Sequence, residues 1–188
     1  VLFRSWRCAD QTLNLAESDW RFGSWHGRLS GRTTTSGDLR LGLSADPPAG
    51  HPLGAVPLHS TLRGHWIRGG VAVDHLEARR GGSRLLAEGR LTRQLALRGG
   101  WLLDPQEFNQ SRGWPAWLRQ RILAGRFTAA GPLLNPQLSA STALNDLPLI
   151  GTGQISAQWR DGVLRLDELR SDHLLASATL PLAAQRGR

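Results

Sequence analysis

The sequence of 188 residues contains no methionine, no tyrosine and no lysine, and its single cysteine is Cys8. One cysteine excludes an internal disulfide framework and any metal site built from several cysteines. No apolar run approaches the roughly 18 residues that a membrane-spanning helix needs, and the opening residues VLFRSWRCAD lack the features of a signal peptide. Because the initial methionine is missing, we expect a fragment or a processed product. We therefore expect any membrane anchor or export signal to lie outside this chain.

Motifs of the common enzyme and cofactor-binding classes are missing as well. The six histidines form no HExxH and no paired spacing with carboxylates, so no metal site is expected. There is no phosphate-binding loop, no GxGxxG and no GxSxG, and the nearest serine phrase, GRLSG at residues 27–31, has the wrong spacing. Asp74 and Asp167 recur in similar contexts, and we interpret both as turn or hydrogen-bonding residues at strand ends. The sequence thus predicts a protein that is not an enzyme and has no cofactor.

What the chain does contain is arginine and alternating apolar residues. Its 23 basic residues exceed its 15 acidic ones, which gives a formal net charge of +8, and 40% of its residues are hydrophobic, enough to bury a core. An apolar residue at every second position is typical of a β-strand with one apolar face. This alternation occurs at Leu39 to Leu43, Val71 and Val73, Leu95 and Leu97, Leu138 to Leu144, Ile155 to Trp159, Leu164 and Leu166, and Leu174 to Leu182. Turn compositions at residues 46–52, 79–82, 131–136 and 160–162 separate the strands, so the pattern predicts an antiparallel sheet.

One segment, GWPAWLRQRILAG at residues 113–125, departs from the alternation. Pro115 suits the first turn of a helix, and Gly125 suits the position just past its end. The apolar residues at helical spacing are Trp114, Trp117, Leu118 and Ile122. We predict one short amphipathic helix near residues 115–124, which packs its tryptophans on the sheet or caps a groove.

The chain also contains an internal repeat, because residues 66–91 are similar to residues 159–180. Before the turn, Val71, Val73, Asp74 and Leu76 match Leu164, Leu166, Asp167 and Leu169; after it, Leu85, Leu86, Ala87 and Leu91 match Leu174, Leu175, Ala176 and Leu180. A weaker copy opens the chain, where Trp6 precedes Leu13 and Leu15. A repeated strand–turn–strand unit predicts an array in which each unit buries its apolar face mainly against its neighbours.

The run from Gly125 to Leu169 resembles the repeats of the TamB family, within the wider AsmA-like group. A typical phrase in that family joins two strands through a Gly-Pro-Leu…Asn-Pro turn and is followed by a strand that begins with Gly. The matching residues are Gly125, Phe127, Gly131, Pro132, Leu133, Asn135, Pro136 and Leu138, then Gly162, Leu164 and Leu166. The first half of the chain is similar but lacks the Gly-Pro-Leu…Asn-Pro turn.

This resemblance implies an elongated, curled antiparallel sheet with a hydrophobic inner trough. It also implies a place in the cell envelope, in the periplasm, with an inner-membrane anchor outside this chain. Family members take part in lipid transport between membranes and in outer-membrane protein assembly or translocation. Phospholipid acyl chains and a barrel-type outer-membrane assembly protein are therefore the partners that the resemblance implies. We divide the chain into a first β-repeat region at 1–103, a linker with the helix at 104–125, and a second β-repeat region at 126–188.

The apolar strand faces are the candidate binding surface, because such a face must be covered by another layer or by a ligand. Burial of an acyl chain against aliphatic side chains contributes about 0.8 kcal/mol of binding free energy per methylene and requires no precise geometry. The expected lining residues are Leu39, Leu41, Leu43, Val71, Val73, Leu138, Leu144, Leu164, Leu166, Leu174, Ala176 and Leu180. Leu76 and Leu169 are expected on the opposite face. The alternative is a purely structural role, in which the same faces close on each other as a sandwich core.

A second alternative is a basic domain whose eight tryptophans and many arginines bind nucleic acid or another anionic partner. Most arginines, such as Arg40 and Arg63, occupy polar strand positions and are interleaved with acidic residues, which is typical of a solvated outer face. Such a face also suits anionic lipid headgroups or an acidic protein. We rank nucleic acid below lipid. A slice of a repeat sheet exposes edge strands, so self-association through them is expected.

Overall fold

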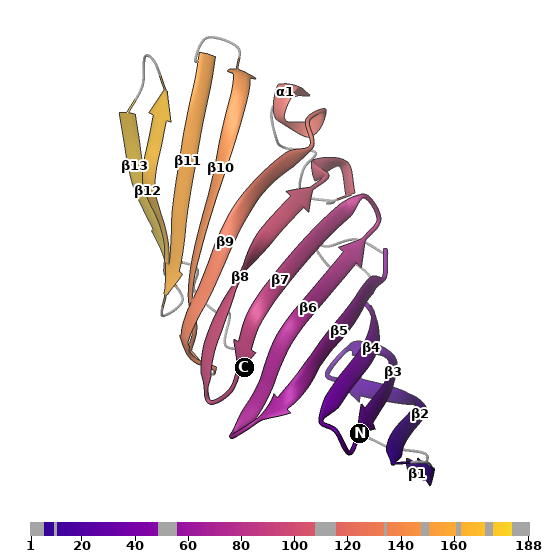
Figure 1. The fold of residues 1–188 in the computed structure, drawn as a ribbon. Helices are drawn as coiled ribbons and strands as arrows, with labels where there is room; N and C mark the ends of the chain where they lie inside the picture. The colour runs from indigo at the N-terminus through magenta and orange to yellow at the C-terminus, as the bar shows by residue number, and fades with distance from the viewer. Residues whose placement is uncertain are drawn as a thin grey trace.

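A single antiparallel sheet makes up nearly the whole chain in a computed structural model (Figure 1). The structure describes residues 6–9, 11–48, 56–107, 116–133, 135–147, 151–160, 163–171 and 175–181. Thirteen strands lie in the sheet in chain order, each paired with the strands before and after it. They are β1 (Trp6–Ala9), β2 (Thr12–Phe22), β3 (Trp25–Thr34), β4 (Asp38–Asp46), β5 (Leu58–Ile67), β6 (Gly70–Arg80), β7 (Ser83–Leu91), β8 (Gln94–Leu103), β9 (Leu123–Pro132), β10 (Gln137–Leu147), β11 (Gly151–Arg160), β12 (Val163–Ser171) and β13 (Leu175–Pro181). The mainly β fold predicted from the sequence is confirmed.

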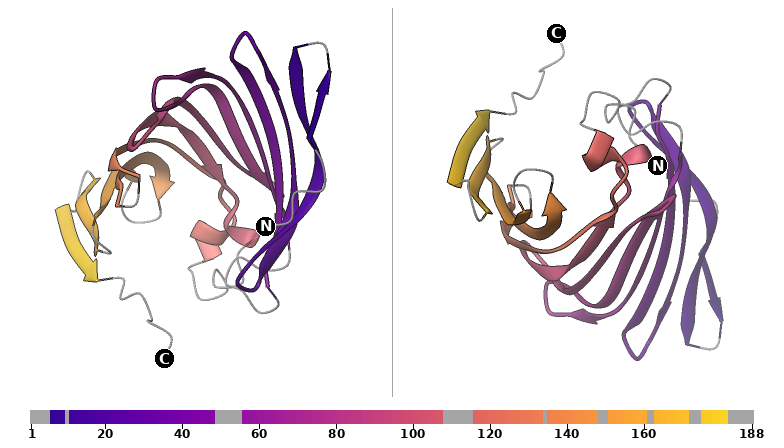
Figure 2. Two further views of the ribbon diagram at one scale, coloured as in Figure 1. Left: turned by 90° about the horizontal axis from the view of Figure 1, so that it is seen from below. Right: turned by 90° about the horizontal axis from the view of Figure 1, so that it is seen from above.

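The sheet is curled but open, with β1 and β13 as its two edges. Viewed end on, the strands curve part of the way around a central space (Figure 2). A short 3-10 helix, η1 (Pro105–Glu107), and α1 (Ala116–Arg119) lie between β8 and β9 in the chain, on the inner side of the curl. All described strands belong to this one sheet, so this part of the chain is not a closed sandwich of two sheets.

The helix is much shorter than the one predicted near residues 115–124. α1 ends at Arg119, and β9 begins at Leu123, which pairs with Leu103 of β8. Gly125, expected just past the end of the helix, instead lies inside β9 opposite Trp101. Pairing with the open edge of β8 provides hydrogen-bond partners for the backbone N–H and C=O groups of these residues. They therefore form a strand although their apolar residues have helical spacing. Ile122, expected on the apolar helix face, is 64% exposed; Trp114 and Pro115 lie outside the described residues.

β8 and β9 pair along their whole length, from Gln94 opposite Pro132 to Leu103 opposite Leu123. The connection at residues 104–122 therefore returns the chain to the strand that it has just left. The residues before and after this connection belong to one continuous sheet.

A β-bulge in β6 keeps its apolar residues on one face. Val73 pairs with Gly89 and Leu76 pairs with Ala87, so the two residues between Val73 and Leu76 stand opposite Glu88 alone. The extra residue returns Leu76 to the same face as Val73. The prediction that Leu76 lies on the opposite face is therefore wrong.

The same bulge recurs in β12 and β2. In β12 the register shifts between Leu166 and Leu169, which also places Leu169 on the same face as Leu166, contrary to the prediction. In β2 a shift follows Leu15. The repeated aspartates, Asp74 and Asp167, occupy the bulges of β6 and β12 and thus lie within strands, not at their ends as predicted.

The register also bears out the alignment of the internal repeat. Five of the eight pairings between β6 and β7 have a counterpart between β12 and β13. The corresponding pairs include Val71–Leu91 and Leu164–Leu180, Val73–Gly89 and Leu166–Ala178, and Leu76–Ala87 and Leu169–Ala176. The repeat unit is thus a bulged hairpin.

Glycines on one face allow adjacent strands to approach very closely. A Cβ atom on Gly99 would lie 1.8 Å from the carbonyl oxygen of Leu86, and one on Gly125 would lie 2.1 Å from that of Ser141. A larger residue at either position would force the neighbouring backbone to shift. Gly27, Gly64 and Gly89 are crowded by neighbouring backbone in the same way. Bulges and glycines are the two features that bend a β-sheet, and this chain uses both for its curl.

Candidate functional site on the inner face

One face of the sheet is apolar from β2 to β11. Residues paired across antiparallel strands point to the same side, so the register defines the face. One row consists of Leu15, Gly31, Leu41, Leu62, Leu76, Ala87, Gly99, Phe127, Ala140 and Ala157. The row beside it consists of Leu39, Gly64, Val73, Gly89, Leu97, Ala129, Leu138 and Trp159.

The position of η1 identifies this face as the inner one. Arg80 and Ser83 pair with each other on the apolar side of the β6–β7 hairpin. The guanidinium of Arg80 donates to the carbonyl oxygen of Glu107 at 3.0 Å, and the Ser83 hydroxyl donates to the Glu107 carboxylate at 2.8 Å. The backbone N–H of Gly82 also donates to this carboxylate. Because η1 lies inside the curl, the face that it touches is the wall of the trough (Figure 2).

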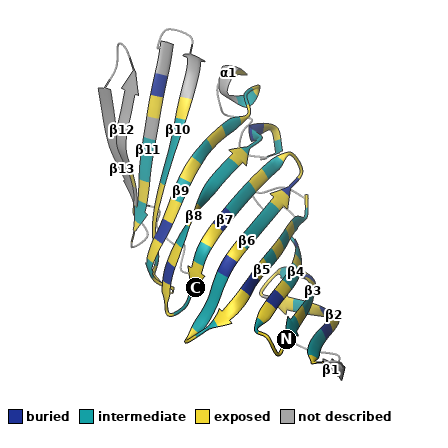
Figure 3. Ribbon diagram, viewed as in Figure 1, coloured by how far each residue is buried: buried dark blue, intermediate teal, exposed yellow. Residues whose placement is uncertain are grey.

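The exposure of the inner-face residues varies from one position to the next. Val73 is 3% exposed and Leu39 and Ala129 are each 4% exposed, although no second layer covers them among the described strands. Figure 3 shows the buried positions as dark blue bands within the strands. Leu138, by contrast, is 38% exposed and Trp66 is 53% exposed. An apolar surface of this kind is available to a ligand.

Charged side chains are confined almost entirely to the other face. Of the inner-face pairing positions of β2 to β11, Arg80 alone holds a charged residue, and it is bonded to η1. The neighbours of the inner residues carry the charge instead: Arg40 beside Leu41, and Arg98 beside Leu97. The partition follows from the period of two, which places successive side chains on opposite faces.

Three inner-face tryptophans, Trp20, Trp66 and Trp101, have hydrogen-bond partners for their indole N–H groups. Trp101 lies over Gly125, where a Cβ would be 2.6 Å from the ring, and its Nε1 donates to the carbonyl oxygen of Arg126 at 3.2 Å. Trp20 donates to the Ser44 carbonyl oxygen at 3.1 Å, and Trp66 donates to the Thr33 hydroxyl at 2.8 Å. With these donors satisfied, the rings present mainly apolar surface to the trough.

The structure places all the described predicted lining residues on the inner face. Those with described side chains are Leu39, Leu41, Leu43, Val71, Val73 and Leu138. For Leu144, Leu164, Leu166, Ala176 and Leu180, the register gives inner-face positions in β10, β12 and β13. Leu174 lies outside the described residues.

Sequence reasoning missed about as many lining residues as it named. These are Leu15, Leu62, Leu76, Leu85, Ala87, Leu95, Leu97, Trp101, Phe127 and Ala129. In β5 the signal is weak, because Ser60 and Gly64 alternate with Leu62 on the inner face and hide the apolar period. In β6 the bulge shifts the period by one residue. For Leu95 and Leu97 the signal was present, since their alternation is regular.

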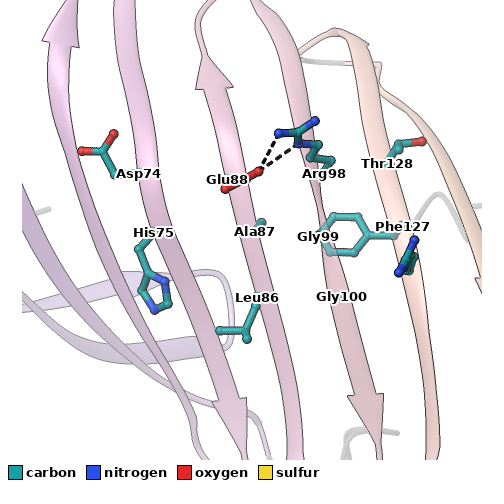
Figure 4. Close-up of a pocket in the computed structure, with 11 residues that line it drawn as sticks. Asp74, His75, Leu86, Ala87, Glu88, Arg98, Gly99, Gly100, Phe127 and Thr128 are labelled. Carbon is teal, nitrogen blue, oxygen red and sulfur yellow. Dashed lines mark hydrogen bonds and ion pairs between the residues drawn. The ribbon is translucent and has the colours of Figure 1, made fainter.

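Open hollows lie between the rows of side chains on the outer face. One of about 500 Å³ is lined by outer-face residues that include Asp74, Glu88, Arg98 and Thr128 (Figure 4). Glu88 and Arg98 form an ion pair at 2.8 Å across β7 and β8. The hollow is also lined by Ala87, Gly99 and Phe127, which are residues of one inner-face row.

Glu77 is the most strongly engaged carboxylate on the outer face. It forms ion pairs with Arg79 and Arg84, and only 15% of its side chain is exposed. The hydrogen bond from Arg79, followed by the charges of the two arginines, holds the pKa of Glu77 below its ordinary value of 4.5. The Glu77 carboxylate is thus fully engaged by Arg79 and Arg84.

Neither a metal centre nor a membrane helix is found in the part of the chain that the structure describes. No group of three or more His, Cys, Asp or Glu residues there is placed to hold a metal ion. No described helix is long and apolar enough to cross a membrane. No family model, no curated protein and no solved structure matches the chain.

Proposed function

We propose that the chain binds and conducts lipid acyl chains along the inner face of its curled sheet, without catalysing a reaction. The observation that supports this most directly is the continuity of the apolar face. The row from Leu15 to Ala157 crosses ten strands with neither a charge nor a covering layer among the described residues. A face of this kind is stabilised when an apolar ligand covers it.

Acyl chains suit this surface for physical reasons. Burial of each methylene contributes about 0.8 kcal/mol and requires contact, not directional bonds. The lining is mainly apolar along its length, so an acyl chain can move from one set of apolar side chains to the next at similar free energy. The indole N–H groups of Trp20, Trp66 and Trp101 have partners in the protein and do not fix a polar group at one point. These properties favour conduction over tight binding at one site.

Nucleic acid suits the same surface poorly. Binding a single strand requires aromatic rings for base stacking and basic residues for phosphates within one groove. Here Trp20, Trp66 and Trp101 lie on the inner face, whereas Arg40 and Arg98 lie on the outer face. One strand of nucleic acid cannot reach both sides of the sheet at once.

The cellular setting is part of the proposal and rests on the TamB-like phrase from Gly125 to Leu138. We place the chain in the cell envelope, between the inner and outer membranes, with its anchor in a segment outside these residues. A barrel-type outer-membrane assembly protein is the proposed partner at one end of the trough. In that setting the trough carries lipid between membranes or assists outer-membrane protein assembly. The apolar lining favours lipid as its direct ligand.

Photo-crosslinking at adjacent positions tests the ligand. The photoreactive amino acid p-benzoylphenylalanine replaces Phe127, which faces the trough, and in a matched control it replaces Thr128, which is exposed on the outer face. After irradiation in cells with two membranes, we expect lipid adducts at position 127 and none at position 128, as detected by mass spectrometry of the purified chain.

Two results would contradict the proposal. Equal lipid labelling at positions 127 and 128 would indicate nonspecific membrane contact. Polypeptide adducts without lipid at position 127 would favour the assembly role, in which the trough holds client segments.

A further inference from the structure

Three arginines form one row across the outer face of the N-terminal half of the sheet. Arg32 of β3 pairs with Arg40 of β4, and Arg40 pairs with Arg63 of β5. All three are exposed. Side chains at paired positions of one face have Cβ atoms about 5 Å apart, so three guanidinium groups are held side by side.

This row lacks the counter-charges found elsewhere on the outer face. Arg28 pairs with Glu17 at 2.9 Å and Arg98 pairs with Glu88 at 2.8 Å, whereas no ion pair of Arg32, Arg40 or Arg63 occurs among the described residues. The next residue in the row is Asn14 at one end and His75 at the other.

The nearest outer-face carboxylate on the same strand as Arg40 belongs to Asp38. It is engaged at the β3–β4 turn, where it accepts hydrogen bonds from the Ser36 and Thr34 hydroxyls at 3.0 and 3.4 Å. Like charges directly opposite each other destabilise a sheet. Repulsion among the three arginines therefore destabilises this part of the sheet, and a bound anion would reduce that repulsion.

A hollow of about 410 Å³ adjoins the row. Its opposite wall is the next outer row, in which Ser30, Gly42 and Thr61 pair with one another. The missing side chain of Gly42 opens the hollow at its centre, and the Ser30 hydroxyl lies 3.1 Å from the point that a Cβ there would occupy. Three guanidinium groups and two hydroxyls thus border one space.

We propose that this hollow binds a phosphate group. Guanidinium forks match phosphate oxygens in bidentate geometry, and charge-assisted hydrogen bonds of this kind are the stronger ones. The hydroxyls of Ser30 and Thr61 supply further donors. The phosphate has two possible sources, the headgroup of an anionic phospholipid at a membrane surface or a soluble phosphate compound. Because the hollow is on the face opposite the trough, it is independent of acyl-chain binding.

The test uses a central variant, Arg40→Gln, and a matched control, Arg90→Gln. Arg90 is an exposed arginine of β7 on the same outer face but outside the row, so each variant removes one positive charge. Inorganic pyrophosphate is titrated by calorimetry into the wild-type chain and both variants. We expect binding to weaken by about tenfold or more in Arg40→Gln, as for loss of a hydrogen bond to a charged group, and to stay near wild type in Arg90→Gln.

A second arm identifies the source of the phosphate. The same three proteins are sedimented with vesicles of phosphatidylglycerol and with vesicles of phosphatidylcholine. If Arg40→Gln loses binding to phosphatidylglycerol vesicles and Arg90→Gln keeps it, the proposal is supported and the phosphate is that of a lipid headgroup. If the wild type binds pyrophosphate but neither kind of vesicle, the ligand is a soluble phosphate compound. Thermal unfolding confirms that the variants fold, and pyrophosphate should raise the midpoint of the wild type but not that of Arg40→Gln.

Other outcomes overturn the proposal. Equal weakening in Arg40→Gln and Arg90→Gln would show a diffuse effect of net charge. Absence of binding to both pyrophosphate and phosphatidylglycerol would exclude a phosphate site. If a single-stranded oligonucleotide alone bound through Arg40, the row would be a nucleic-acid contact instead.

Discussion

Two adjacent glycines in β8 provide a sharp test of the curl. Gly99 faces the trough and Gly100 faces outward. A Cβ on Gly99 would lie 1.8 Å from the carbonyl oxygen of Leu86 and 2.9 Å from the Cα of Ala87, both backbone atoms of β7. A Cβ on Gly100 would meet its nearest neighbour, the carbonyl oxygen of Gly125, at 3.5 Å, which is ordinary contact. The two substitutions to alanine therefore differ only in the side on which a methyl group is added.

The expected free energies have opposite signs. Neither glycine has a positive φ, so the effect of Gly99→Ala is steric. Forcing a methyl group into backbone requires β7 and β8 to shift, which costs about 1–3 kcal/mol. Replacing glycine in a strand interior returns about 0.5–1 kcal/mol through lower chain entropy. We expect Gly99→Ala to destabilise the chain by about 1–2 kcal/mol and Gly100→Ala to be neutral or to stabilise it slightly.

Urea unfolding followed by tryptophan fluorescence measures both values, since the chain has eight tryptophans. The midpoint should fall for Gly99→Ala and stay or rise for Gly100→Ala, with unchanged slope. If both variants had the same free energy of unfolding, β7 and β8 would not approach as closely as described. The account of the curl through inner-face glycines would then be wrong.

Three further changes have expected outcomes. Leu97→Asp places a carboxylate in the trough and should abolish lipid co-purification, measured by mass spectrometry, whereas Ala96→Asp on the outer face should leave it intact. Ser83→Ala removes a hydroxyl that donates to Glu107 and should cost about 1 kcal/mol, seen as faster hydrogen exchange in η1 with little change in the central strands. The pKa of Glu77 is lowered on folding, so its ion pairs stabilise the chain above its unfolded-state pKa, and this stabilisation is lost as the pH falls through the lower folded-state value. Glu77→Gln should therefore reduce the fall in unfolding free energy between neutral and acid pH, and an unchanged pH profile would contradict this assignment.

The strands could be predicted from the sequence wherever apolar and polar residues alternate regularly. Leu39, Leu41 and Leu43 face one way because no bulge interrupts β4, and the same holds for Leu95 and Leu97 in β8. The turn at residues 131–136 was also predicted correctly. In it, the backbone N–H of Asn135 donates to the carbonyl oxygen of Pro132 at 2.9 Å. In these segments the local pattern and the tertiary structure agree.

The errors arose where pairing between strands decided the outcome. Leu76 was assigned to the wrong face because a bulge is defined by the pairing of a strand with its neighbours. The sequence of one strand alone does not show where it occurs. The signal that could have located it was the recurrence of Asp74 and Asp167 at the same place in the repeat. The helix was predicted too long because Leu123 pairs with Leu103, a residue of another strand, and helical spacing within one segment does not reveal such a pairing.

A single-layer sheet has a consequence for how one chain can hold two unrelated binding surfaces. In a sandwich, one face of each strand is consumed by the core, so only the outer face is left for ligands. Here both faces remain available, and the period of two assigns adjacent residues to different chemistry: Leu41 to the apolar trough and Arg40 to the charged exterior. The bulge at Asp74 preserves this separation by realigning Leu76 with the trough. Without it, every inner residue beyond Val73 in β6 would exchange places with a polar one, and both the trough and the charged face would end at that strand.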